Sequence, residues 1–289
     1  MSCSWKTLYY NRISTQKSIV IVSSFFLNIN LNIFKDIFLN YIEMEHLRVS
    51  TITSILQIST DLDLKKIYDL TPITKYIPFI EYGSENIPKG FSKKMLRKKR
   101  KKTTKKIFYN QATLHVFHDG KIMNVKLFNN GKIQITGLKK EGQGPILIQN
   151  LIDYFYDISM FNKEVKILKH DLVLINSDFD LGFEIDREVL HNEIIESGIY
   201  SSYEPCIYPG VNIKYFINQN QFDGICSCNS ICNGKGRADG DGKCKKITIA
   251  VFKSGKVIIT GGQNISQLET SYRFIKNFIE ERKELFVLK

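Results

Sequence analysis

The sequence predicts an α+β fold built from two similar halves, each with antiparallel strands covered on one side by helices. The first observation behind this prediction is an internal repeat, because Val125–Lys139 and Ile249–Gln263 both contain F-x-x-G-K-x-x-x-T-G. The second is that each copy alternates like a strand pair and is followed by a helical stripe. The 124 residues from Phe128 to Phe252 are too many for a solenoid repeat and fit a duplicated subdomain.

Each copy of the repeat is predicted to form a β-hairpin that turns at Asn130-Gly131 or at Ser254-Gly255. Successive strand residues point to opposite faces, so one face of each hairpin is expected to be aliphatic. That face comprises Val125, Leu127, Ile133 and Ile135, and in the second copy Ile247, Ile249, Val251, Val257 and Ile259. The other face comprises Asn124, Lys126, Phe128, Gln134 and Thr136, and in the second copy Thr248, Ala250, Phe252, Ile258 and Thr260. An antiparallel sheet covered on one side gives this pattern.

A helix is predicted after each hairpin, because apolar residues recur there at helical spacing. The stripes are Leu147, Leu151, Phe155 and Ile158, and then Ile265, Leu268, Tyr272, Ile275 and Ile279. Ser266 and Glu269 are expected to form a capping box at the start of the second helix. Each helix is expected to cover the aliphatic face of its own hairpin. The face with Phe and Thr is then left open, and function is expected there.

Composition narrows the classes of function. The net charge of +12 and the pI near 9.3 favour a polyanionic partner.

The apolar stretch Ser18–Phe34 is too short and too rich in Asn for a membrane anchor. Residues 1–43 are expected to be an N-terminal extension, either poorly ordered or untranslated with Met44 as the start. The common nucleotide-binding, serine-hydrolase and zinc-protease motifs are absent from the sequence, so no enzyme is predicted.

Three further segments carry a resemblance to a known family. They are LDLK at Leu62–Lys65, IPKGF at Ile87–Phe91 and, above all, SSYEPCIYPGVNIKYF at Ser201–Phe216. In this order, within the duplicated framework, they resemble the TATA-box-binding protein over about residues 46–286. The resemblance implies repeats at residues 44–165 and 166–289. It also implies a pseudo-two-fold saddle, whose curved antiparallel sheet has helices on its convex face and binds the minor groove of promoter DNA by its concave face.

In that family, two pairs of aromatic side chains wedge between base steps and bend the DNA. By position, the resemblance implies that Tyr208 and Phe252 form the second pair. Phe128 belongs to the first pair, with Phe91 as its partner and Phe108 as the alternative, because an insertion follows Phe91. The resemblance also assigns base-contacting positions to Thr136, Thr260, Gln134 and Ile258, and backbone-contacting positions to Lys132, Lys256 and Lys214.

The sequence departs from the family at the asparagines expected on the first strand of each repeat. Gapless alignment puts Thr51 and Leu174 there, and Asn176 lies one alternation further on as a DNA-contacting candidate. The resemblance further implies RNA polymerase machinery as a partner and, at Glu204, a protein like transcription factor IIB. It implies a nuclear protein, or one of a cytoplasmic viral factory or virion if the AT-rich composition is that of a large DNA virus. A protein-interaction scaffold with weak DNA binding is the alternative.

Two insertions interrupt the predicted repeats. The basic run Lys93–Lys106 would flank the first aromatic pair, where it could clamp phosphate, act as a nuclear-import signal or be merely solvated. The second insertion, Asn218–Lys245, contains Cys226, Cys228, Cys232 and Cys244. These thiolates could bind one structural Zn²⁺, or the segment could be a flexible loop with incidental cysteines. No other cofactor is expected.

Overall fold

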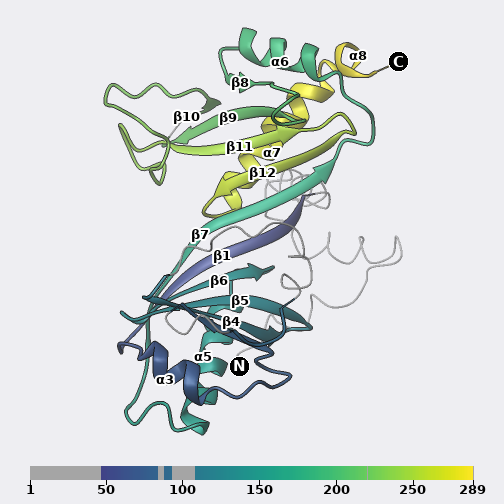
Figure 1. The fold of residues 1–289 in the computed structure, drawn as a ribbon. Coiled ribbons are helices and arrows are strands. Elements are labelled where there is room, and N and C mark those ends of the chain that lie inside the picture. The colour runs from purple at the N-terminus through teal and green to yellow at the C-terminus, as the bar shows by residue number, and fades with distance from the viewer. Residues whose placement is uncertain (1–46, 84–87, 93–107, 220, 289) are drawn as a thin grey trace, which may run out of the picture. The chain divides into compact units, whose positions relative to one another are not determined.

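The computed structural model describes residues 47–83, 88–92, 108–219 and 221–288 (Figure 1). The predicted N-terminal extension, with the apolar stretch Ser18–Phe34, and the basic run Lys93–Lys106 therefore lie outside the described residues. Among the residues that are described, no helix is long and apolar enough to cross a membrane.

Two halves with a similar order of elements follow one another along the chain. The first half contains β1 (Arg48–Ile58), α3 (Leu64–Leu70), β2 (Phe79–Tyr82), β3 (Lys89–Gly90), β4 (Gln111–His118), β5 (Lys121–Phe128), β6 (Lys132–Leu138) and α5 (Gln143–Asp157). The second half contains β7 (Ile167–Asp180), α6 (Arg187–Glu196), β8 (Tyr200–Ser202), β9 (Val211–Asn218), β10 (Gln221–Gly224), β11 (Lys245–Val251), β12 (Lys256–Gly262), α7 (Ile265–Glu280) and α8 (Lys283–Phe286).

All strands of the described chain join one open sheet, and every pairing in it is antiparallel. The order is β10-β9-β11-β12-β7-β1-β6-β5-β4-β2-β3, with β8 beside β9. The two halves meet at β1 and β7, where Ile52 pairs with Ile175. Thr53 pairs with Thr136 of β6, and Asn176 pairs with Thr260 of β12, so the two halves match across the Ile52–Ile175 pair.

One face of the sheet is covered by helices, as the alternation predicts. The predicted aliphatic residues of both hairpins are at most 2% exposed. They pack with Leu147, Leu151 and Phe155 of α5 and with Leu268, Tyr272, Ile275 and Ile279 of α7. Each fully buried aliphatic side chain stabilises the fold by about 1.5–3 kcal/mol. The predicted α+β fold of two repeats, with a curved antiparallel sheet and helices on one face, is confirmed.

The start of α7 corrects one local prediction. The N-cap is Asn264, whose side-chain oxygen accepts a hydrogen bond from the N–H of Gln267 at 2.9 Å. The side chain of Gln267 in turn accepts from the N–H of Gln263. The predicted pair Ser266 and Glu269 is wrong, because the helix begins two residues earlier and asparagine and glutamine provide the reciprocal bonds.

The turn glycines allow a test of the hairpin geometry. Gly255 has φ +76°, and a Cβ there would overlap the carbonyl oxygen of Phe183. Gly120, between β4 and β5, has nearly the same φ, +77°, but a Cβ at this position would have no atom of the described chain within 4 Å. We expect Gly120→Ala to cost about 1 kcal/mol from backbone strain alone.

Gly255→Ala is expected to cost at least about 2 kcal/mol, because the backbone must also move away from Phe183. Urea unfolding of both variants and the parent chain measures this difference. Equal losses of unfolding free energy would contradict the close contact between the turn and Phe183.

Candidate nucleic-acid interface

Among the described residues, no helix covers the sheet face opposite α5 and α7, and we call this face the open face. The chain alternation places there the predicted residues Lys132, Gln134 and Thr136 of β6, Lys256, Ile258 and Thr260 of β12, Asn176 of β7 and Lys214 of β9. Phe128 ends β5 on this face, and Phe252 follows β11. The structure therefore brings these residues onto a single surface.

The centre of the open face carries two matched polar pairs. Asn176 lies beside Thr260, and Thr53 lies beside Thr136, with its hydroxyl 3.4 Å from that of Thr136. The pairing register makes Thr53 the counterpart of Asn176, at the same offset that relates Thr51 to Leu174. One half presents an amide at this position, and the other presents a hydroxyl.

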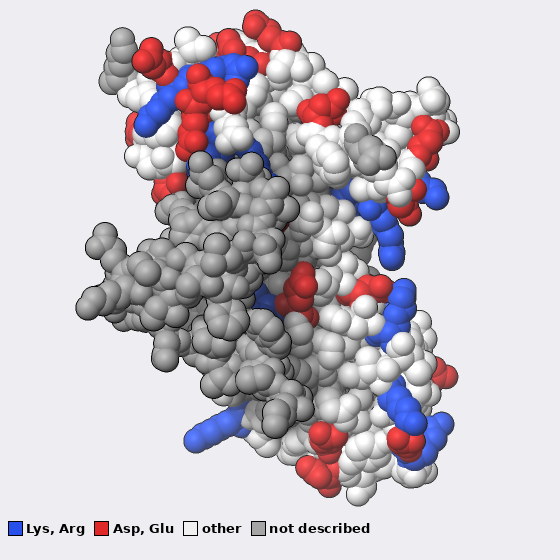
Figure 2. Space-filling view, turned by 180° about the vertical axis from the view of Figure 1, so that it is seen from behind, with Lys and Arg blue, Asp and Glu red and all other residues white. Residues whose placement is uncertain are grey.

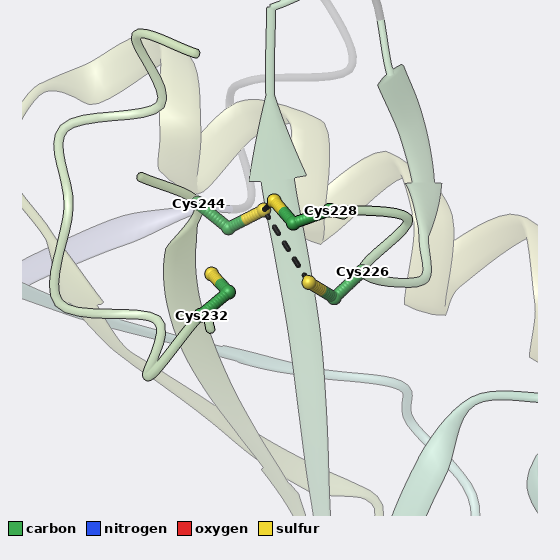
Figure 3. Close-up of side chains that lie close together, drawn as sticks. All are labelled: Cys226, Cys228, Cys232 and Cys244. Carbon is green, nitrogen blue, oxygen red and sulfur yellow. Dashed lines mark hydrogen bonds between the residues drawn. The ribbon is translucent and has the colours of Figure 1, made fainter. Parts of the chain in front are cut away.

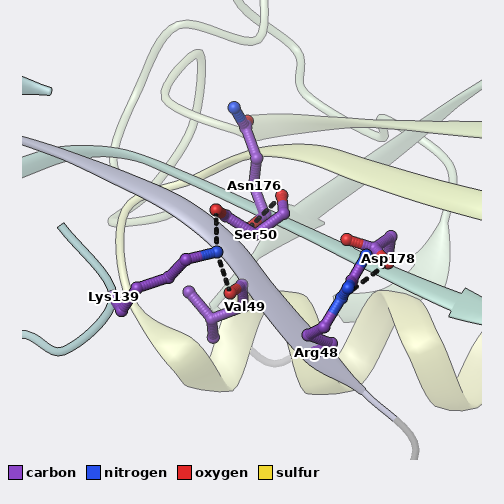
Figure 4. A network of polar contacts seen from close by, with 6 residues as sticks. All are labelled: Arg48, Val49, Ser50, Lys139, Asn176 and Asp178. Carbon is purple, nitrogen blue, oxygen red and sulfur yellow. Dashed lines mark hydrogen bonds and ion pairs between the residues drawn. The ribbon is translucent and has the colours of Figure 1, made fainter. Parts of the chain in front are cut away.

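A polar network fixes the backbone around Asn176 (Figure 4). At a bulge in β1, the hydroxyl of Ser50 donates to the carbonyl of Asn176 at 3.0 Å. The ammonium of Lys139 donates to the carbonyls of Val49 and Ser50. Arg48 forms an ion pair with Asp178, two residues along β7, at 2.6 Å. The side-chain oxygen of Asn176 is buried and has no hydrogen-bond partner among the described residues.

Tyr208 and Phe252 form an aromatic pair at one end of the open face. Their ring centroids are 5.8 Å apart at an interplanar angle of 61°. Tyr208 is 39% exposed, so one side of the pair meets solvent. Gly210 lies under both rings, and a Cβ there would come within 3.1 Å of Tyr208 and 3.2 Å of Phe252. A larger residue at position 210 would push the rings apart.

The loop before β9 holds Tyr208 in place by contacts that the sequence did not indicate. Arg187 at the start of α6 lies over the ring of Tyr203 at 5.2 Å and donates to the carbonyl of Pro209. The carbonyl of Glu204 accepts from the N–H groups of Ile207 and Tyr208, at 2.9 and 2.8 Å, which closes a tight turn. The side chain of Glu204 is exposed at this turn.

The first half does not place Phe91 beside Phe128. Phe91 follows β3, and its N–H donates to the carbonyl of Pro78 just before β2. Two strands, β2 and β4, separate β3 from β5, and Phe128 lies opposite Gln111 at the other end of β4. Phe91 is 70% exposed and lines a separate part of the open face.

The strand register indicates Tyr109 as the counterpart of Tyr208. Ala112 pairs with Leu127 as Val211 pairs with Val251, and the two aromatic residues each lie three positions earlier. Tyr109 is 67% exposed, and its neighbour Phe108, the sequence-based alternative, corresponds to Ile207. Gly83 lies against the backbone of Phe108, where the described chain resumes. In the sequence, counting residues backward from β4, instead of forward from the IPKGF motif, would have identified Tyr109 as the counterpart of Tyr208.

The two halves of the open face differ in chemistry. Ala250 and Ile258 lie side by side in the second half, where the first half has Lys126 and Gln134 at the matching positions. The first half is also hollowed by about 1390 Å³, between β2, β4, β5 and β6. Its floor includes Phe79, which packs against His115 with ring centroids 4.7 Å apart. The second half is thus the more apolar surface.

Lysines surround and enter the open face. Lys132 and Lys256 are exposed at the starts of matching strands. Lys214 instead lies within the face and donates to the hydroxyl of Thr248 at 3.1 Å. Burial, and then the charge of Lys246, lowers the pKa of Lys214 below its usual value. On the side seen in Figure 2, basic and acidic side chains are intermixed over the described surface.

Residues 172–281 match the family model described as transcription factor TFIID (or TATA-binding protein, TBP). The matched stretch runs from β7 to just past α7, which is the second half of the sheet and its helices. The family match in the second half and the similarity to viral proteins support a divergent TBP-like protein. The first half, which carries Lys126 and Gln134, lies outside the match.

Three known proteins illustrate this likeness. The chain is 26% identical over 287 residues to the TATA-box-binding protein-like protein of Acanthamoeba polyphaga mimivirus, covering 91% of this chain and 74% of that protein. It is 25% identical over 192 residues to an African swine fever virus protein described as "Putative TATA-binding protein pB263R", covering 65% of this chain and 67% of that protein. The solved structure of Methanococcus jannaschii TBP is 17% identical, covers 82% of this chain and 99% of its own, and has a TM-score of 0.49.

The lowered pKa of Lys214 gives a prediction for stability. A lysine whose pKa is lower in the folded chain destabilises the fold while it is charged in both states, and this cost fades as the pH rises through the ordinary lysine range. We therefore expect Lys214→Met to raise the unfolding free energy near pH 7, and the gain to shrink by about pH 10.5.

Urea unfolding at the two pH values measures this effect, with Lys132→Met as the control because Lys132 is exposed. A loss of stability in Lys214→Met at both pH values would show that the hydrogen bond to Thr248 outweighs the burial of the charge.

Proposed function

We propose that the protein is a transcription initiation factor that binds AT-rich promoter DNA through the minor groove and bends it. The observation that carries the proposal is the Tyr208–Phe252 pair, with Tyr208 exposed and Phe252 partly exposed, at the end of the open face. The likeness to TBP supports a transcription-related DNA-binding role, and that family consists of DNA-binding factors that are not enzymes.

The aromatic pairs would act as wedges. An apolar ring that enters a base step replaces one stacking contact, and the bent duplex then meets more of the protein surface. Phe252 offers a fully apolar edge. Tyr208 has a hydroxyl that requires a polar partner when it is desolvated, so we infer that Tyr208 supports Phe252 and enters less deeply. In the first half, Phe128 and Tyr109 would take the same roles.

The polar centre of the open face would meet the acceptors of the minor groove. That groove presents A N3 and T O2 at both orientations of an A·T pair, while a G·C pair adds a guanine amino group. The amide of Asn176 and the hydroxyls of Thr53, Thr136 and Thr260 can donate to such acceptors. Gln134 adds a further hydrogen-bond donor. The apolar side chain of Ile258 favours A·T pairs, because they lack the guanine amino group that protrudes into the minor groove.

The lysines would bind the phosphate backbone. Lys132, Lys256 and Lys214 fix the position of the duplex without reading its sequence. Each phosphate neutralised is expected to steepen the log–log dependence of affinity on salt by about 0.9. The basic run Lys93–Lys106 would add to this slope. We propose that it flanks the first aromatic pair, because the described chain resumes closely after it at Phe108 and Tyr109.

The turn at Glu204 is the proposed docking point for a partner like transcription factor IIB. Its exposed carboxylate lies on the same turn that holds Tyr208, so partner binding and DNA bending would share one rigid element. Recruitment of RNA polymerase would follow from that contact. Because the similar proteins named above include viral ones, we propose that this takes place inside an infected cell, in the nucleus or a cytoplasmic viral factory, with the virion as a further site.

The alternative function is a protein-interaction scaffold with weak DNA binding. The observation that favours it is the charged and polar centre of the first half, where Lys126 and Gln134 replace the apolar pair Ala250 and Ile258. A face of this kind can bind an acidic protein surface as well as phosphate.

Binding and bending separate the two functions. We expect end-to-end energy transfer on a labelled AT-rich duplex to rise on binding, and a GC-rich duplex of equal length to bind more weakly. Phe252→Ala is expected to lose most of the bending and at least tenfold in affinity, about 1.4 kcal/mol. Leu285→Ala, which removes an exposed side chain of α8, is the control.

Equal, weak binding of both duplexes without bending would favour the scaffold. Circular dichroism of Phe252→Ala checks that the fold is retained. A variant that binds poorly because it is unfolded would assign Phe252 to the core instead.

The first aromatic pair has its own test. Tyr109→Ala is expected to reduce bending nearly as much as Phe128→Ala, because the register places Tyr109 as Tyr208 is placed. Phe91→Ala removes a side chain that is equally exposed and lies elsewhere on the face, so bending should be retained. The opposite result, loss in Phe91→Ala alone, would restore the assignment made from the sequence.

A further inference from the structure

Four cysteine side chains converge in the insertion between β9 and β11. Their sulfur atoms all lie within 4.8 Å of one another. The Sγ atom of Cys244 is 3.3 Å from that of Cys228 and 3.7 Å from that of Cys226. Figure 3 shows the four side chains, including Cys232, lying close together. Because Cys244 is well separated in sequence from the other three, this convergence is a product of the folded insertion.

The spacing fits a tetrahedral metal site better than a pair of disulfides. A zinc–sulfur bond of about 2.3 Å implies sulfur atoms about 3.8 Å apart around a tetrahedron. A disulfide requires about 2.05 Å between two sulfurs and leaves the other pair separate. Here Cys244 is close to both Cys226 and Cys228, and it is 1% exposed. All ligands are sulfur and the ligand set is complete, which is typical of a structural zinc site.

Hydrogen-bond donors around the sulfurs provide a second, independent observation. The side-chain amide of Asn218 donates to Cys244 Sγ at 3.3 Å, and its other contacts hold the backbone of Gly240 at 2.9 and 3.1 Å. Backbone N–H groups of Cys228 and Gly234 donate to Cys226 and Cys232, each two residues earlier. Donors of this kind stabilise thiolate ligands and orient them toward a metal.

The insertion needs a cross-link because it has little core of its own. Ile231 is fully exposed and Phe222 is 59% exposed, so neither anchors the segment. The chain instead packs closely through glycine, since a Cβ at Gly234 would overlap Lys246. Burial of Cys244 alone cannot hold a Gly-rich segment of this length against its conformational entropy.

We propose that Cys226, Cys228, Cys232 and Cys244 bind one structural Zn²⁺ ion that fastens the insertion to the sheet. On binding, each thiol gives up its proton to solvent and its sulfur forms a bond to zinc, so four neutral thiols and one Zn²⁺ yield a complex of charge −2 and four protons. No oxidation takes place. The ion joins the segment after β10 to the start of β11.

The site would define the outer end of the open face in the second half. The N–H of Lys246 donates to the carbonyl of Gly234 at 2.8 Å, and Lys235 forms a bridge with Lys245. Gly234 lies against Phe216, which points to the open face from β9. Zinc would therefore hold the insertion against the rim of the open face. This inference does not depend on DNA binding, and its test does not use DNA.

The test is metal content in the full chain, purified in reducing buffer without chelator. We expect about one zinc per chain by mass spectrometry of the metal. Cys232→Ser should lose it, while Cys206→Ser should keep it, because Cys206 is an exposed cysteine outside the cluster. Cobalt added to the metal-stripped wild-type chain should give the absorption bands of a tetrahedral thiolate complex, a result that does not depend on any variant folding.

Limited trypsin digestion gives a second readout. Cleavage at Lys235, Arg237 or Lys243 should be slow in the zinc-loaded chain and fast after zinc is removed, because the metal holds these backbone segments. The proposal is overturned if the reduced chain contains no zinc and gives no thiolate spectrum with cobalt. It is also overturned if Cys232→Ser retains the same zinc as the wild type, or if the native chain has lost four hydrogens to two disulfides.

Discussion

The pairing of β1 with β7 is the constraint on which the rest of the fold depends. It joins two hairpin-and-helix units into one sheet and lets both helices cover the same side. The matched registers around Ile52 and Ile175 place Thr53 and Asn176 symmetrically beside the threonines of the neighbouring strands. Bulges in this pairing are bridged by Ser50 and Lys139, so side chains replace ladder hydrogen bonds that the bulge removes.

The two halves have similar backbone arrangements but different side chains on the open face. In the second half, Ala250 and Ile258 keep the open face apolar, and this is the half that matches the TBP family model. In the first half, Lys126 and Gln134 take those positions. Such exchanges cost the fold little, because side chains on the open face are not packed against a helix. On the buried face a polar group would lose its contact with water, and the residues there are aliphatic in both halves.

Local patterns were sufficient to predict the fold and most of the candidate site. A period of two in the hairpins and a helical stripe after each one fixed which residues face α5 and α7, since burial of aliphatic surface dominates such choices. The repeated turn at Gly131 and Gly255 showed which residues of the two hairpins correspond to each other. From that symmetry and the strand alternation alone, Phe128 and Phe252, with their neighbouring threonines and lysines, could be placed on one face. Their contact with DNA remains a prediction.

Features that depend on contacts between distant segments could be read only from the folded chain. Tyr109 was missed because an insertion separates it from the motif before it, and the strand register, not local sequence, restores its equivalence to Tyr208. The sequence supplied four cysteines with unusual spacing, and the loop geometry brought their sulfurs together. Residue types and periodicity thus determined the layers of this protein, because each element must bury its apolar face. The tertiary structure alone decided which side chains meet, because pairing register and loop closure are set by contacts across the whole sheet.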